Sequence, residues 1–249
     1  MRNVSVVLLV VFLAGCVTER TGGLPPPAED NVRLQAQLDL ARGYLASEDW
    51  SRARPPLRRA LEIDARSAET HVLLAILSER SDEPGIAESH LKRALKIDPN
   101  YPQALNNYGT FLYGQGRYDE ALVPLRRLVG NPEYHMRAQA FENLGLTELK
   151  VGTEDAAKEA FSRALRLNVG QPRSSLELAD IAYSEGNFDS ARNYYEGFRS
   201  MSRQNPRSLC LGIKLGREFG ETDQVASYSL VLRNLYPRSA EAQRCETPK

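Results

Sequence analysis

Net charge is absent from this chain, and cysteine, histidine and long apolar runs are scarce. Its 249 residues include 32 Lys and Arg against 32 Asp and Glu. With no overall field, nothing draws the protein to nucleic acid or to an anionic membrane surface. The apolar run from Val4 to Ala14 is too short for a membrane-spanning helix, which needs about 20 apolar residues. We therefore expect a partner to be recognised by local complementarity.

Motifs of several enzyme classes are missing as well. No HExxH, GxSxG or Walker sequence occurs, and "GQGRYD" beginning at Gly114 lacks the third glycine of a dinucleotide-binding loop. The three histidines, His71, His90 and His135, have no further ligand at metal-binding spacing. Scattered carboxylates on amphipathic helices are typical of a solvent-facing side. The sequence therefore predicts no enzyme, no cofactor, no metal site and no small-molecule substrate.

What the N-terminus does contain is an export signal. Arg2 precedes the apolar core, and Leu13-Ala14-Gly15 supplies the small residues that a signal peptidase requires before the cut. Residues 1–15 are therefore predicted to be a signal peptide. Cys16 follows at once, which leaves two interpretations: an incidental cysteine after an ordinary signal, or a residue that is itself modified.

Leu13-Ala14-Gly15-Cys16 resembles a bacterial lipobox, in which the cysteine is acylated and becomes the first residue of the mature chain. The resemblance implies lipidation at Cys16. Two or more acyl chains anchor stably, at ~0.8 kcal/mol per buried CH₂. Val17 stands where lipoproteins retained in the inner membrane often have Asp. The resemblance therefore implies sorting to the outer membrane, on its periplasmic face.

Residues 16–30 are expected to be the lipidated N-terminus and a tether. Two glycines loosen this segment, and Pro25-Pro26-Pro27 stiffens it toward polyproline II. Ordered structure is expected to begin near Asn31.

From there small residues recur with a period of 34. Alanines stand at 53, 87, 121, 157 and 191, separated by 34, 34, 36 and 34 residues. Another small residue lies twelve positions before each of them, and a large apolar residue lies four positions after. The small residues are Ala41, Ala75, Gly109, Gly145 and Ala179, and the large ones are Leu57, Leu91, Leu125, Phe161 and Tyr195. Such spacings keep side chains on one face of a helix.

This pattern resembles the tetratricopeptide repeat, whose unit of 34 residues is a pair of antiparallel helices. The resemblance implies an all-α, right-handed superhelical solenoid of about six helix pairs over residues 31–237. The repeats are expected near 34–67, 68–101, 102–137, 138–171, 172–205 and 206–237, with a C-terminal cap over 238–249. The sixth departs most from the pattern and could slip by one residue. The two extra residues near 130–133 are either a loop insertion or a hinge.

Two cysteines remain beside Cys16. In an oxidising compartment they favour a disulfide between Cys210 and Cys245, which would pin the C-terminal segment to the sixth repeat. Two buried free thiols are the alternative.

A catalytically silent helical array is expected to bind a protein along the groove lined by its first helices. The repeat register places nine residues in that groove: Leu38, Arg42, Leu45, Val72, Ile76, Glu79, Asn106, Thr110 and Tyr113. The first two repeats would then offer an apolar contact patch. The alternative is that a neighbouring helix or the tether packs on some of these residues. A clamp for a chain-terminal carboxylate would need recurring Lys and Asn, and only Asn106 fits.

Lipobox, proline-rich tether, six repeats and a late cysteine pair together resemble the PilF/PilW family of type IV pilus biogenesis lipoproteins. The resemblance implies a pilotin that binds the secretin subunit through its groove and promotes its outer-membrane localisation and multimer assembly. The alternative is another periplasm-facing repeat lipoprotein, an adaptor that recruits cell-wall (murein) enzymes.

Overall fold

The computed structural model describes residues 27–246, and these residues form thirteen α-helices and no β-strand. The predicted signal peptide, Cys16 and most of the tether lie outside the described residues. The helices are α1 (Pro27–Ala46), α2 (Trp50–Ile63), α3 (Ala68–Arg80), α4 (Pro84–Ile97), α5 (Pro102–Gly114), α6 (Tyr118–Val129), α7 (Arg137–Val151), α8 (Glu154–Leu167), α9 (Pro172–Ser184), α10 (Phe188–Met201), α11 (Pro206–Glu218), α12 (Thr222–Leu235) and α13 (Ala240–Glu246).

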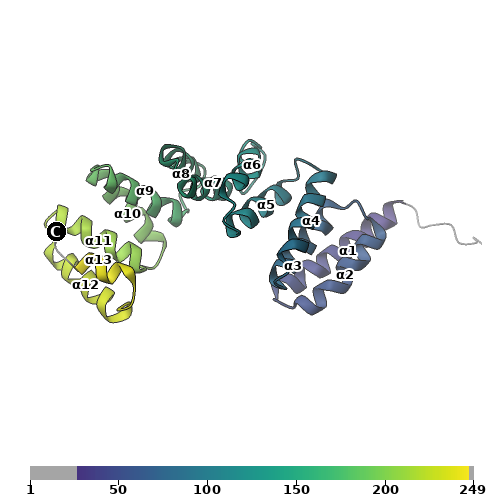
Figure 1. Cartoon of the computed structure of the whole chain (residues 1–249), viewed down its shortest axis with the longest axis horizontal. Helices are drawn as coiled ribbons and strands as arrows, with labels where there is room; N and C mark the ends of the chain where they lie inside the picture. The colour runs from purple at the N-terminus through teal and green to yellow at the C-terminus, as the bar shows by residue number, and fades with distance from the viewer. Residues whose placement is uncertain (1–26, 247–249) are drawn as a thin grey trace, which may run out of the picture.

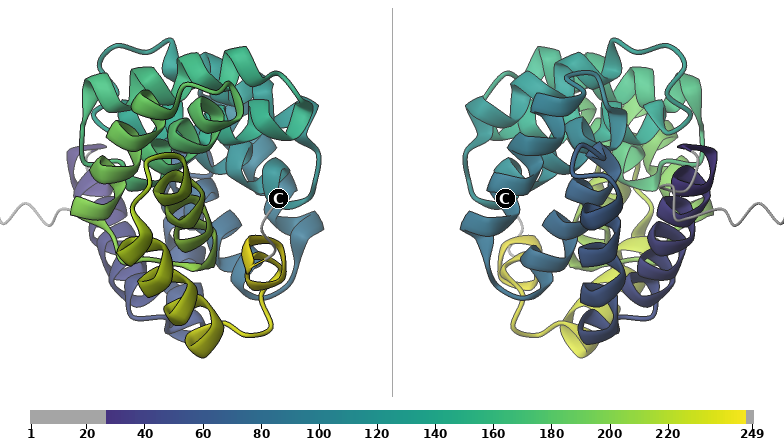
Figure 2. Two further views of the ribbon diagram at one scale, coloured as in Figure 1. Left: turned by 90° about the vertical axis from the view of Figure 1, so that its left-hand side faces the viewer. Right: turned by 90° about the vertical axis from the view of Figure 1, so that its right-hand side faces the viewer.

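Consecutive helices pair, and six pairs stack into an arch (Figure 1). Helices α6 and α8 lie at the top of the arch in this view, and α5 lies below α6 (Figure 1). Seen end-on, the pairs wind around a common axis (Figure 2). The prediction of an all-α solenoid of six helix pairs is therefore confirmed.

Each pair turns through one residue whose φ is positive. These residues are Glu48 and Asp82, both at 57°, and Gly116, Gly152, Gly186 and Gly220, at 72° to 91°. Glycine adopts this region freely, whereas a residue with a Cβ is strained in it. The first two repeats therefore carry strain at a position where the other four have glycine.

The small and large residues of the repeat meet where the two helices of a pair cross. A Cβ on Gly109 would lie 2.6 Å from a side-chain carbon of Leu125, and one on Gly145 would lie 2.7 Å from the ring of Phe161. Leu125 and Phe161 are fully buried. The missing side chain on one helix therefore makes room for the large side chain on the other, as close helix packing requires.

In the sixth helix pair, the glycine that makes room for a large side chain stands one residue earlier than the repeat spacing predicts. A Cβ on Gly212 would lie 2.5 Å from the ring of Tyr228, and Ile213 is instead buried on the side that packs with Leu232. The turn glycines Gly186 and Gly220 keep the spacing of 34 residues, so only this close contact moves by one position. The shifted contact explains why Ile213 and Ser229 break the series of small and large residues in the sequence.

The first helix begins earlier than the tether prediction allows. Pro27 is the first described residue and already belongs to helix α1 (Pro27–Ala46), four residues before the expected start of order at Asn31. Pro27 is therefore part of a helix and not of an extended spacer.

The extra residues between the third and fourth pairs form a packed connection. Tyr134 is 8 % exposed and packs with Leu105, Leu128 and Ala140. Arg137 Nε donates a hydrogen bond to the carbonyl oxygen of Val129 at 2.9 Å. Because this connection is tied to both neighbouring repeats, the structure favours a loop insertion over a hinge.

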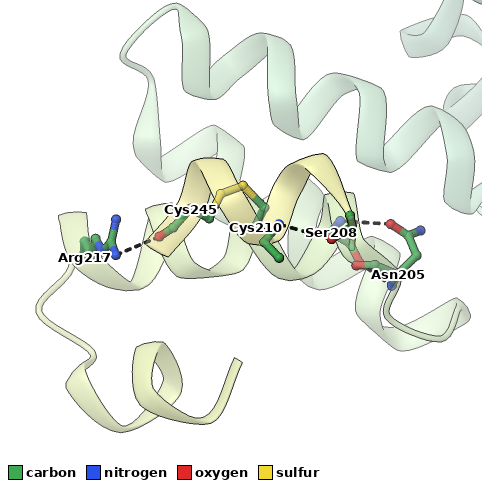
Figure 3. Close-up of a disulfide and its surroundings, with 7 residues drawn as sticks. Asn205, Ser208, Cys210, Arg217 and Cys245 are labelled. Carbon is green, nitrogen blue, oxygen red and sulfur yellow. Dashed lines mark hydrogen bonds between the residues drawn. A yellow bond between two sulfur atoms is a disulfide. The ribbon is translucent and has the colours of Figure 1, made fainter. Parts of the chain in front are cut away.

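Helix α13 closes the C-terminal end of the array. It begins 34 residues after α11, so it occupies the place of the first helix of a further repeat. A disulfide joins Cys245 on α13 to Cys210 on α11, with the Cα atoms 5.6 Å apart (Figure 3). Arg217 donates to the carbonyl oxygen of Cys245 at 2.9 Å. The cap is thus a truncated repeat that is held covalently.

Candidate partner-binding groove

Two of the residues predicted to line the groove lie in the core instead. Leu38 is 2 % exposed and packs with Ala41 and Leu57, and Val72 is 4 % exposed beside Ala94 and Ala104. The prediction is wrong for both, because the neighbouring helices cover this side of α1 and α3. These leucine and valine side chains are therefore not available to a partner.

The apolar patch expected on the first two repeats is also wrong. Leu45 and Ile76 are half-buried and pack against the core cluster that contains Leu38. Arg42 pairs with Asp39 on its own helix and with Glu69 on α3. Glu79 is exposed. This end of the groove thus presents a charged surface in which an arginine already has two carboxylate partners.

In the third repeat two of the three predicted residues, Thr110 and Tyr113, line a hollow. Thr110 is exposed, Asn106 and Tyr113 are half-buried, and all three lie on one face of α5. Thr110 and Tyr113 line a hollow of about 160 Å³ that extends over the facing sides of α5, α7 and α9. Its other lining residues are Leu125, Asn143, Leu146, Thr147 and Arg173. We call this site the central hollow.

Hydrogen bonds inside the central hollow fix most of its polar groups. Asn143 Nδ2 donates to Asn106 Oδ1 at 3.3 Å, which joins α7 to α5. Thr110 Oγ1 donates to the carbonyl of Asn106 at 3.0 Å, and Thr147 Oγ1 donates to that of Asn143 at 2.8 Å. The two threonine hydroxyl protons are therefore already used, while the hydroxyl of Tyr113 has no hydrogen-bond partner within residues 27–246.

Arg173 brings an unpaired positive charge to the central hollow. Its side chain is exposed at the start of α9, and it makes no ion pair within the described part of the chain. The two nearest acidic residues along α7 and α9 have other partners. Glu142 Oε2 accepts from the backbone N–H and the hydroxyl of Ser174 at 3.1 and 2.8 Å, and both Glu177 oxygens accept from Arg207 at 2.6 Å.

Arg207 itself is neutralised by two carboxylates. Besides Glu177 it contacts Asp180, whose oxygen lies 2.5 Å from a guanidinium nitrogen. Burial raises the pKa of Asp180, and the charge of Arg207 acts in the opposite direction. The ion pairs stabilise the contact between α9 and α11. They leave no charge on Arg207 for a partner.

Comparisons with known proteins agree with this fold. Sequence profiles of the tetratricopeptide repeat match residues 38–102, 142–206 and 90–123. The chain is 42% identical to the type IV pilus assembly protein PilF of Pseudomonas aeruginosa, over 100% of this chain and 99% of that protein. It belongs to the PilF/PilW family of tetratricopeptide repeat proteins.

Two solved structures of the family show the same architecture. The structure of Pseudomonas aeruginosa PilF matches with a TM-score of 0.84 at 42% identity, over 87% of this chain and 97% of that one. PilW, described as a widely conserved type IV pilus biogenesis factor, matches with a TM-score of 0.71 at 25% identity, over 88% and 99% of the two chains. The PilF/PilW fold therefore extends over nearly all of the described residues.

Sequence reasoning missed three groove residues of this PilF/PilW family member: Asn143, Thr147 and Arg173. The spacing gave no signal for Asn143. It lies 37 residues after Asn106, whereas the 36-residue spacing between these two repeats leads to Glu142. Only the hydrogen bond between the two asparagines shows that they face each other.

Two histidines of this PilF/PilW family member form a contact outside the groove. The Nδ1 atoms of His71 on α3 and His90 on α4 lie 3.0 Å apart. Burial lowers the pKa of both rings, so that one neutral ring donates to the other. No group of three or more potential metal ligands occurs in residues 27–246, and no helix of that range is long and apolar enough to span a bilayer.

Proposed function

We propose that this chain is a lipid-anchored outer-membrane pilotin that binds the secretin subunit of a type IV pilus and promotes its localisation and multimer assembly. The full-length likeness to PilF is the observation that carries the proposal. The central hollow supports a binding role, since polar groups and the unpaired Arg173 line it. The protein acts as a carrier and catalyses no reaction.

In the proposed mechanism the N-terminus anchors the protein and the helix pairs bind the partner. Acyl chains on Cys16 hold the protein at the membrane, while the helix pairs hold a secretin segment in the groove. Ion pairs and the asparagine contact between first helices keep the groove in one shape before the partner arrives. A preformed groove lowers the ordering cost of binding.

Fractionation of cells tests the anchor. Cys16→Ser should yield protein that still co-purifies with secretin but no longer carries it to the outer membrane. Val17→Asp is the matched control, because it leaves the acylated cysteine in place and changes only the sorting position. In that variant we expect acylated protein and secretin to accumulate together in the inner membrane.

Two results would overturn the proposal. One is a normal amount of secretin multimer in the outer membrane of Cys16→Ser cells. The other is co-purification of cell-wall hydrolases or synthases in place of secretin, which would favour an adaptor role for the same fold.

A further inference from the structure

The central hollow contains hydrogen-bond donors that have no acceptor. Arg173 presents its guanidinium group with no ion pair in residues 27–246, and the Tyr113 hydroxyl and the second N–H of the Asn143 amide also lack a partner there. A guanidinium carries five N–H donors and no acceptor. The hollow therefore offers unpaired donors and a positive charge, while the acceptors on its wall include the neutral hydroxyl oxygens of Thr110 and Thr147.

We propose that the central hollow binds the carboxylate of an Asp or Glu side chain on an extended partner segment. This inference rests on the proposed function and names the chemistry that the groove recognises. The carboxylate would accept from Arg173, Tyr113 and Asn143, which lie on three successive first helices. Hydrogen bonds between charged groups are about twice as strong as those between neutral groups.

Neighbouring charges do not satisfy Arg173 instead. Glu142 accepts from Ser174 through Oε2 and Glu177 accepts from Arg207 through both oxygens, and neither carboxylate forms an ion pair with Arg173. The guanidinium of Arg173 can therefore still pair with a carboxylate from a partner.

The shape of the hollow favours a side chain over a chain terminus. Leu125 and Leu146 line it beside the polar groups, and both are buried. The CH₂ groups of Asp or Glu can pack on these leucines while the carboxylate reaches Arg173. A terminal carboxylate would bring the backbone and side chain of its own residue into the same hollow of about 160 Å³.

Site-specific crosslinking in cells identifies the segment that lies in the groove. A photoreactive phenylalanine replaces Gln103, an exposed residue one turn before Asn106 on the same face of α5. The full lipoprotein is irradiated in cells, and the captured peptide is sequenced by mass spectrometry. We expect a secretin peptide with Asp or Glu close to the crosslink. Capture of a different protein would count against the proposed function, and the carboxylate test below would still apply to the captured segment.

The captured segment is then synthesised in three forms: native, with its Asp and Glu replaced by Asn and Gln, and with its carboxyl terminus amidated. Binding to the full chain is measured by fluorescence anisotropy. We expect the amide replacements to weaken binding about tenfold, as loss of a charge-assisted hydrogen bond implies. The amidated form should bind like the native form.

Variants of the protein complete the test. Arg173→Gln should weaken binding of the native peptide about tenfold and leave binding of the Asn/Gln peptide unchanged. Arg173→Lys keeps the charge but lacks the planar guanidinium group, so it should recover part of the lost affinity. Arg58→Gln, an exposed arginine on α2, is the matched control and should have no effect. Equal binding of all peptides to Arg173→Gln and to the wild type would overturn the inference, as would dependence on the terminal carboxylate alone.

Discussion

The contact between Gly145 and Phe161 yields the sharpest prediction about packing. A Cβ at position 145 would lie 2.7, 2.8 and 2.9 Å from three ring carbons, whereas ordinary contact begins at 3.4 Å. Such overpacking costs about 1–3 kcal/mol. The higher helix propensity of alanine returns about 1 kcal/mol. We therefore expect Gly145→Ala to lower the free energy of unfolding by about 1 kcal/mol.

A double-mutant cycle combines Gly145→Ala with a substitution that removes the ring of Phe161. Phe161→Leu alone should destabilise by about 1–2 kcal/mol, because it leaves a cavity. The double variant reproduces the pair Ala75 and Leu91 of the second repeat, both fully buried. Alanine and leucine then fit each other, and the coupling energy should be favourable by about 1–2 kcal/mol.

Urea unfolding followed by circular dichroism measures the four corners of the cycle, and hydrogen exchange of α7 and α8 locates the change. Gly43→Ala is the control, because a Cβ there meets nothing within 4 Å. It should stabilise the protein by about 1 kcal/mol. Single-variant effects that add within about 0.5 kcal/mol would refute the argument that the two positions share one space.

Three further predictions concern the turns, the cap and the histidines. Glu48→Gly should raise the thermal midpoint by relieving a φ of 57°, a gain of about 0.5–1 kcal/mol. Cys245→Ser should lower the midpoint, since the disulfide closes a loop of 35 residues and is worth about 3–4 kcal/mol in the chain-entropy model, and a reductant should abolish the difference from wild type. Burial lowers the pKa of His71 and His90 from the usual 6.5, so stability should hold above pH 6.5 and decline as pH falls below it. His90→Gln should reduce that decline in thermal melts between pH 7.5 and 5.

The repeat period was sufficient to predict the helix pairs. Small residues at fixed spacing report close helix crossings, and prolines at the starts of α5, α9 and α11 report boundaries that local backbone chemistry sets. Both patterns can be recognised in a single sequence, because each depends on residues that lie within one repeat. Pro27 belongs to helix α1, although the run of prolines favoured a spacer at this point.

The groove was harder to predict, because it depends on contacts between repeats. Leu38 and Val72 share a helix face with exposed residues, and only the neighbouring helices decide that these two are covered. Asn143 and Arg173 reach the central hollow from different repeats. Gly212 took the place of Ile213 because Tyr195 and Tyr228 occupy the space that a side chain would need. Which of these residues are buried, exposed or in close contact depends on packing between repeats and cannot be read from the spacing within one repeat.

Co-purification of secretin with groove variants tests the central claim most directly. Thr110→Trp fills the central hollow from an exposed position, and Arg58→Trp places the same side chain on an exposed position of α2. The full lipoprotein is purified from membranes in detergent, and the secretin retained is measured by quantitative mass spectrometry. We predict that wild type and Arg58→Trp retain secretin and that Thr110→Trp loses it. Equal retention by all three proteins would contradict the groove as the binding site.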